Sequence, residues 1–167
     1  MPVYGAHLKL VYANMLMTIF TVPFINYTTL YDPIGVFMLR IIGYLIVSDT
    51  LFYWIHRFSH TNKHLWKYHK KHHEFQYPSG ITAIYAHPID FILTNLLPFL
   101  CGPALFGYSL HTLIFWLTLV IFNAVISHSS LNFPIYYDAN HGIHHVKRNV
   151  NFGFILWDKI CKTKNDN

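Results

Sequence analysis

The sequence predicts an all-α membrane protein with about four transmembrane helices in two hairpins and a helical, histidine-rich metal site facing the cytosol. Its composition, its long apolar stretches and its histidine spacing lead to this prediction. Hydrophobic residues make up 53% of the 167 residues and charged residues only 11%, less than half the charged share usual in soluble domains. This length suits one compact domain, so residues 1–167 are interpreted as a single membrane domain.

The membrane helices are predicted from apolar stretches, because about 20 helical residues cover a hydrocarbon core of roughly 30 Å. We interpret the first stretch, interrupted by Asn14 and Pro23, as a retained membrane segment and not a removed signal peptide. No strongly basic start precedes it and no small-residue cleavage site follows it. The third stretch is short for a full span and is expected to be tilted or shallow. The four stretches are about 8–27, 34–55, 89–101 and 108–127.

The basic residues gather in two segments of the chain. Of the 12 Lys and Arg residues, five lie in 57–71 and five in 147–164, whereas 28–33 and 101–107 contain none. Lys and Arg accumulate on the cytoplasmic flanks of membrane helices, which favours this interpretation over a surface for nucleic acid. We therefore predict that both basic segments and both termini lie on the cytosolic side.

Eight of the 13 histidines form three clusters with helical spacing. Residues at i, i+3 and i+4 share a helix face, so the side chains of each cluster should converge. Neutral imidazole binds Fe, Zn, Cu and Ni well, whereas a solvated basic face would use Lys or Arg. The spacing therefore predicts metal binding, and the number of ligands indicates two metals. The clusters are His56 and His60; His69, His72 and His73; and His141, His144 and His145.

Five histidines lie outside these clusters. His87 and His128 fall on the same predicted membrane side as the clusters and are candidate ligands. His64 is interpreted either as a ligand or as an exposed residue. His7 and His111 are assigned no role, because a lone histidine near a membrane interface is usually a surface residue.

Three carboxylates are candidates for orienting the ligands, because a metal-bound imidazole usually passes its other N–H to a carboxylate or carbonyl. Asp49 lies within the second apolar stretch, on nearly the same helix face as His56. A carboxylate inside a membrane span is costly and is a functional candidate by default. Asp90 and Asp138 lie three residues from a candidate ligand. Glu74 is interpreted as a solvated charge.

The motifs HRFSH, HKKHH, AHPID, SHSSLNFP and HGIHH, followed by NFG and WDK, resemble the fatty acid hydroxylase/sterol desaturase superfamily over about 45–163. The resemblance implies a cytosol-facing di-iron centre that uses O2 and two electrons from cytochrome b5 or a reductase. It also implies location in the endoplasmic reticulum if the source is a eukaryote. One departure is Gly142, where the family commonly carries Asp. The implied ligands are His56, His60, His69, His72, His73, His87, His128, His141, His144 and His145.

The leading hypothesis is an O2-dependent di-iron oxidoreductase that hydroxylates or desaturates a membrane lipid in lipid biosynthesis. Oxidation of an aliphatic C–H bond belongs to a redox metal, because such a bond offers side chains no acid, base or leaving group. The AHPID and SHSSLNFP motifs resemble those of sterol-modifying members, which favours a sterol-like lipid, with fatty acids and sphingoid bases as further options. The alternative is a non-catalytic homologue that binds zinc and acts as a scaffold or subunit, since imidazole ligands accept zinc as well as iron.

Overall fold

The computed structural model describes residues 2–21, 29–129, 140–154 and 156–165, and every regular element within these ranges is helical. Short 3₁₀ turns at His72–Glu74 (η2) and Gly80–Ile84 (η3) connect longer helices, and a π-helical turn, Ile92–Leu96 (η4), joins two of them. The α-helices are α1 (Pro2–Thr21), α2 (Ile34–Thr61), α3 (Lys63–His69), α4 (Pro88–Phe91), α5 (Leu97–Phe106), α6 (Leu110–His128), α7 (Asn140–Lys147) and α8 (Leu156–Ile160).

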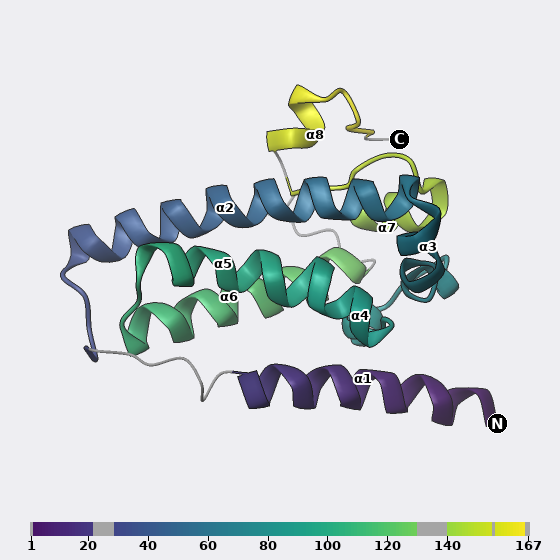
Figure 1. Cartoon of the computed structure of the whole chain (residues 1–167), viewed down its shortest axis with the longest axis horizontal. Helices are drawn as coiled ribbons and strands as arrows, with labels where there is room; N and C mark the ends of the chain where they lie inside the picture. The colour runs from purple at the N-terminus through teal and green to yellow at the C-terminus, as the bar shows by residue number, and fades with distance from the viewer. Residues whose placement is uncertain (1, 22–28, 130–139, 155, 166–167) are drawn as a thin grey trace.

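Within the described part of the chain, three helical segments are long and apolar enough to cross a membrane. They are α2, the run Pro88–Phe106 that joins α4, η4 and α5, and α6. Figure 1 shows the three running side by side in alternating directions, with α3, α7 and the chain termini at one end. The sequence predicts that the histidine segments and the termini lie at the same end of the bundle, and they do (Figure 1).

The first predicted apolar stretch forms α1, which is a helix but is not one of these three segments. Lys9, Asn14 and Thr18 interrupt its apolar residues. The predicted pairing of this stretch with α2 is also corrected, because α1 packs on η3 and α4, and α2 packs along α5. Residues 22–27 of the predicted stretch lie outside the described residues.

The third apolar stretch is longer than predicted. The helical run continues to Phe106 and has 19 residues, enough for a full span. Gly102 and Pro103 lie inside helix α5 and do not end it, and such residues are tolerated in membrane helices where neighbouring helices pack against them. Gly102 also allows α5 to approach α2 closely, since a Cβ atom there would lie 2.8 Å from the Tyr44 Cα.

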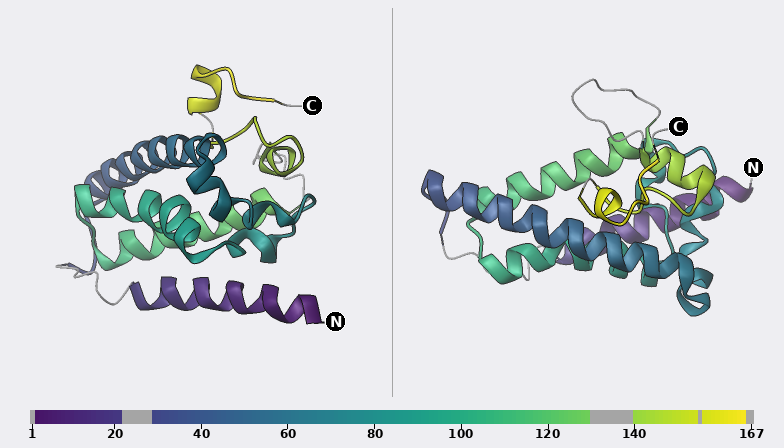
Figure 2. Two further views of the ribbon diagram at one scale, coloured as in Figure 1. Left: turned by 45° about the vertical axis from the view of Figure 1, so that its right-hand side comes forward. Right: turned by 90° about the horizontal axis from the view of Figure 1, so that it is seen from above.

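Helix α2 extends beyond the predicted apolar stretch and carries the first histidine cluster on its last turns. Asn62 ends α2 and begins α3, and its side-chain oxygen accepts the backbone N–H groups of His64 (2.9 Å) and Leu65 (3.3 Å). This cap provides for a sharp change of chain direction, visible in Figures 1 and 2. The turn brings the histidines of α3 and η2 back toward those of α2.

At the opposite end of the bundle, Asp32 joins α2 to α6. Its carboxylate accepts hydrogen bonds from Arg40 (2.5 Å), Ser109 (3.0 Å) and Thr112. These hydrogen bonds fix α2 and α6 relative to each other at the end of the bundle that lies opposite the histidines.

Candidate metal centre

Nine of the ten predicted ligands converge at one end of the bundle and form two groups. Within each group, one ring nitrogen from every histidine lies within 4.8 Å of the others. Eight of the nine side chains are buried, and His60 is half-buried. The first histidine group is His56, His60, His69, His73 and His144, and the second is His72, His128, His141 and His145.

Each of the two histidine triplets contributes residues to both groups. In the triplet that begins at His69, the i and i+4 residues join the first group and the i+3 residue, His72, joins the second. In the triplet of α7 the assignment is reversed, so that His144, at i+3, joins the first group. Residues at i and i+4 share a face more closely than the residue between them. Each triplet therefore contributes to both groups, which lie next to each other.

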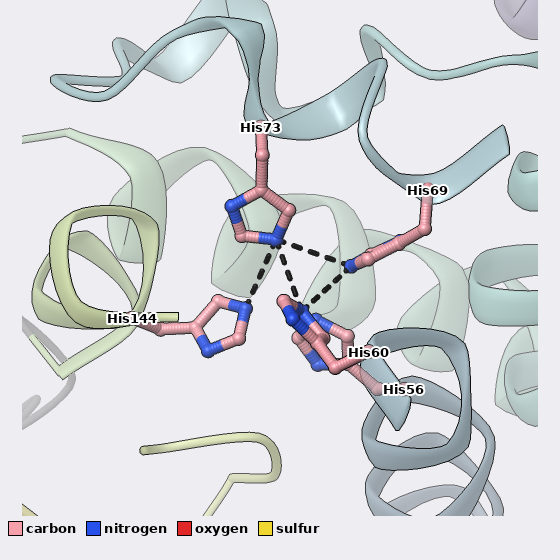
Figure 3. Close-up of side chains that lie close together, drawn as sticks. All are labelled: His56, His60, His69, His73 and His144. Atoms are coloured by element: carbon pink, nitrogen blue, oxygen red, sulfur yellow. Dashed lines mark hydrogen bonds between the residues drawn. The ribbon is translucent and has the colours of Figure 1, made fainter. Parts of the chain in front are cut away.

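The nitrogen spacing in the first group fits a single cation. The Nε2 atom of His60 lies 3.0 Å from that of His69 and 3.1 Å from that of His73, and the His73 and His144 Nε2 atoms are 3.2 Å apart. Imidazole nitrogens bind such metals at about 2.1 Å, so two ligands at a right angle lie about 3.0 Å apart. Figure 3 shows these rings turned toward one common point.

The second group has a similar but looser arrangement, with 3.4 Å between the Nε2 atoms of His72 and His128. This distance corresponds to two ligands at a tetrahedral angle around one cation, about 3.4 Å apart for bonds of about 2.1 Å. The buried Nε2 atoms of His141 and His145, and that of His56 in the first group, have no hydrogen-bond partner among the described residues. Buried nitrogens of this kind require a partner, and a metal ion fits each group.

Six of the nine histidines have their other ring nitrogen, Nδ1, fixed by an oxygen acceptor. An Nδ1–H that donates to oxygen leaves the Nε2 lone pair directed into the group, which is the tautomer that binds metal. Four of the acceptors lie 13 or more residues from their histidine, so the orientation of these ligands depends on the fold, whereas those of His128 and His144 are local. The pairs are His56–Phe152 O (2.7 Å), His69–Asp90 Oδ1 (2.9 Å), His72–Tyr85 O (3.1 Å), His128–Ala124 O (2.8 Å), His144–Val150 O (2.7 Å) and His145–Phe75 O (2.9 Å).

Burial keeps five histidines outside the spanning helices neutral. Desolvation, with the nearby His69, lowers the pKa of His72 to about 4. Desolvation and neighbouring imidazoles also lower the pKa values of His73, His141 and His145 well below their usual range, and burial does the same for the pKa of His144. A neutral imidazole is the form that binds a metal ion, so no proton has to be displaced at neutral pH.

The remaining histidines lie elsewhere. His87 is outside both groups: its Nδ1 accepts the Ile89 backbone N–H (3.2 Å) and caps α4. His64 is exposed on α3, and the His111 ring packs against Phe37. The His7 ring, on α1, packs against the rings of Phe75 and Tyr85.

The three predicted carboxylates differ in whether they contact a histidine. Asp90 contacts a ligand directly, through His69. Asp49 instead accepts the backbone N–H groups of Phe154 (2.9 Å) and Leu156 (3.3 Å), in the same segment whose Phe152 carbonyl orients His56. Asp138 lies outside the described residues.

Two further carboxylates support this end of the molecule. Asp158, which the sequence reasoning missed although it belongs to the WDK motif, accepts the backbone N–H groups of Phe152 (3.0 Å) and Gly153 (2.6 Å). Glu74 is not a simple solvated charge, because it accepts hydrogen bonds from Lys71 (2.8 Å) and Tyr85. These contacts fix backbone segments that present carbonyls to the ligands.

A cavity leads from the spanning helices to both histidine groups. Histidines of both groups line its polar end. The rest of its wall comes from the spans and the segment before α8, and includes stacked rings of Phe52 and Phe154 with centroids 5.0 Å apart. Asn95 and Asn123, each within a spanning segment, add polar amides to this wall. The cavity therefore places an apolar wall directly beside the histidines of both groups.

Residues 41–163 match the fatty acid hydroxylase family model. Fatty acid hydroxylase domain-containing protein 2 of Homo sapiens is 34% identical over 71% of the chain and 36% of its own length. A C-4 methylsterol oxidase of Schizosaccharomyces pombe is 33% identical over 80% of the chain and 49% of its own length. Methylsterol monooxygenase 2-1 of Arabidopsis thaliana is 40% identical over 57% of the chain and 35% of its own length.

The chain thus spans a third to a half of the length of these relatives. No solved structure matches it. The matched region includes all three spanning segments in whole or large part, and all nine converging histidines. The chain belongs to the fatty acid hydroxylase family.

Proposed function

We propose that this chain forms the di-iron core of an O2-dependent oxidoreductase that hydroxylates or desaturates a membrane lipid. The observation that carries the proposal is the convergence of nine histidines into two groups, each spaced for one cation, at one end of three membrane-length helices. Soluble di-iron bundles rely on Glu and His ligands, whereas here each described group can be completed by histidine alone.

The five imidazoles of the first group would hold one iron and the four of the second group the other. Bound iron supplies the redox chemistry for activating O2 and oxidising an aliphatic C–H bond, which the side chains alone cannot supply. Iron is favoured over zinc because two of the relatives are named as an oxidase and a monooxygenase.

The protein's own residues position the ligands and exclude water. Backbone carbonyls, among them those of Phe152 and Val150, keep five of the imidazoles in the metal-binding tautomer, and the Asp90 carboxylate does so for His69. The rings of Phe52, Phe99 and Phe154 stack within 5.9 Å of one another and form an apolar wall beside the histidines. A lipid chain or ring in this cavity would lie against that wall, with its target carbon facing the groups.

A sterol-like lipid is the favoured substrate, since relatives are named for methylsterols. A relative from Oryza sativa that is 40% identical over 57% of the chain is a very-long-chain aldehyde decarbonylase, which keeps a long-chain lipid as the second option. The basic residues around the histidine end, including Arg57, Lys67 and Lys70, favour a cytosolic position for this end. There an electron donor such as cytochrome b5 or a reductase would dock, at the endoplasmic reticulum if the source is a eukaryote.

The proposal is tested by incubating the purified, iron-loaded protein with a 4-methylsterol, O2 and a reductase system in lipid nanodiscs. O2-dependent formation of an oxidised sterol supports it, and a parallel incubation with a C26 aldehyde tests the long-chain option. If the iron-loaded protein oxidises neither lipid, and zinc is the metal retained on purification, the chain is instead a metal-binding scaffold or subunit.

A further inference from the structure

Helix α1 is fastened to the backbone segment that orients the second histidine group. Asn14 on α1 is fully buried, with 0% of its surface exposed. Its Nδ2 donates two hydrogen bonds, to the carbonyl of Ile84 (2.8 Å) and to that of Ala86 (3.0 Å). These carbonyls lie on either side of Tyr85, so the amide holds the backbone before and after this residue.

Tyr85 supplies the carbonyl that accepts the Nδ1–H of His72 at 3.1 Å. The peptide that carries this carbonyl lies between the two that Asn14 binds. Rotation of the Tyr85 carbonyl would therefore move a neighbouring carbonyl off the Asn14 amide. In this way Asn14 acts on the ring orientation of His72 without touching the histidine.

A second contact from the same helix reaches the other end of this segment. The His7 ring packs edge-on against Phe75 and Tyr85, with centroids 5.2 and 5.0 Å away. The carbonyl of Phe75 accepts the Nδ1–H of His145 at 2.9 Å. His7 and Asn14 are seven residues apart and so lie on one side of α1. One helix face thus contacts the two segments that orient two ligands of the second group.

The first histidine group takes its Nδ1 acceptors from other places. They are Asp90, Val150 and Phe152, and within the described residues none of these three forms a hydrogen bond with α1. Helix α1 also packs on α4, which carries Asp90, but within the described residues it forms no hydrogen bond with that residue. The hydrogen-bond dependence on α1 is therefore unequal between the two groups.

We propose that Asn14 is a positioning residue for the second histidine group, so that docking of α1 sets the affinity of one of the two metals. The inference rests on the proposed function, since it requires a metal in each group. Partners that orient metal ligands from outside the coordination sphere typically contribute 10- to 100-fold in metal affinity. Loss of the Asn14 amide should weaken metal binding by the second histidine group by about this factor. Metal binding by the first histidine group should stay unchanged.

The test separates the two groups by removing most ligands of one group at a time. The second-group background carries His60→Ala, His73→Ala and His144→Ala, so that only the second group is complete. The first-group background carries His72→Ala and His141→Ala, so that only the first group is complete. Asn14→Leu is introduced into each background of the full chain, purified without a histidine tag. Binding of Co²⁺ is measured anaerobically by equilibrium dialysis and by the visible absorption of the bound ion, with no reliance on enzyme activity.

Asn14→Leu should weaken Co²⁺ binding about 10- to 100-fold in the second-group background and by less than twofold in the first-group background. Thr18→Val is the matched control on α1, because the Thr18 hydroxyl bonds only within the helix, to the Asn14 carbonyl (3.0 Å). It should change neither affinity. If Asn14→Leu does not fold, Asn14→Ser removes the same two hydrogen bonds with a smaller, polar side chain.

Equal affinities with and without Asn14→Leu in both backgrounds would overturn the inference, and so would an equal loss in both. The second result would make Asn14 a general structural residue. Failure of the proposed function gives a different result: the chain would then oxidise no lipid in the nanodisc assay, whereas the Co²⁺ affinities in the two backgrounds would still report on Asn14.

Discussion

The Nδ1 atom of His69 lies 2.9 Å from the Asp90 carboxylate, and the two side chains are 1% and 3% exposed. Asp90 is the one carboxylate within the described residues that directly contacts a histidine of either group. A carboxylate fixes the metal-binding tautomer and increases the basicity of the ligand more than a carbonyl does. The first group therefore has an anionic partner as well as its five imidazoles.

Replacing Asp90 by Asn should weaken metal binding by the first histidine group more than metal binding by the second. The amide keeps the size of the side chain but removes its negative charge, so we expect about a 10- to 100-fold loss in first-group affinity. Anaerobic Co²⁺ titration in the first-group background (His72→Ala with His141→Ala) checks this value. An unchanged affinity there would show that the carboxylate is not needed to hold the metal.

Removing one ligand from either group should abolish lipid oxidation. His72→Ala affects the second group and His144→Ala the first, and both groups are needed if the two metals act together. We expect activity to fall to background while each variant still inserts in the membrane, as shown by carbonate-resistant membrane association. His64→Ala is the matched control, because His64 is exposed on α3. Full activity of both ligand variants would refute a shared site.

Asp49→Asn should reduce iron occupancy or turnover several-fold, through an indirect route. The carboxylate holds the N–H groups of Phe154 and Leu156, and the adjoining Phe152 carbonyl orients His56. Weakening a buried hydrogen bond to a charged group costs about 1.5–3 kcal/mol, part of which would appear as misorientation of His56. Iron content and turnover are measured together. Wild-type values for both would make Asp49 a residue of the helix interior without influence on the site.

The metal-free protein should lose stability as the pH falls. In the folded protein burial lowers the pKa of His72 to about 4, and the pKa values of His73, His141, His144 and His145 also lie well below the unfolded value near 6.5. Below pH 6.5 the unfolded chain therefore binds protons that the folded chain does not, so acidification favours unfolding.

Thermal unfolding of the metal-free protein in detergent, measured from pH 7.5 to 5, checks this linkage. The midpoint temperature should fall steadily over that range. A midpoint that stays constant or rises would contradict the burial of neutral imidazoles.

The histidine spacing predicted most of the site, because i, i+3 and i+4 positions converge on any helix. It could not predict that His72 belongs to the second group and His144 to the first, since that depends on how α3 and α7 face each other. His87 was grouped with the ligands by its neighbourhood, but Pro88 begins α4 and places His87 at the helix cap. Asn14 was interpreted only as an interruption, because a lone polar residue gives no signal of the carbonyls it meets.

The spanning helices were predicted where apolar residues run without a break. Gly102 and Pro103 resembled the end of a helix, but the close approach of α5 to Tyr44 requires the glycine and the helix continues. Sequence hydropathy gives the length of an apolar run. It cannot show such packing, or that α1 would pack on η3 and not on α2.

Each of the two histidine groups is proposed to bind one iron ion. The most direct test is the metal content of the detergent-purified protein, prepared without added metal and without a histidine tag. We predict close to two irons per chain, falling to about one in the variant with His60→Ala, His73→Ala and His144→Ala or in the variant with His72→Ala and His141→Ala. Zinc alone, with no uptake of ferrous iron on anaerobic reconstitution, would contradict the claim.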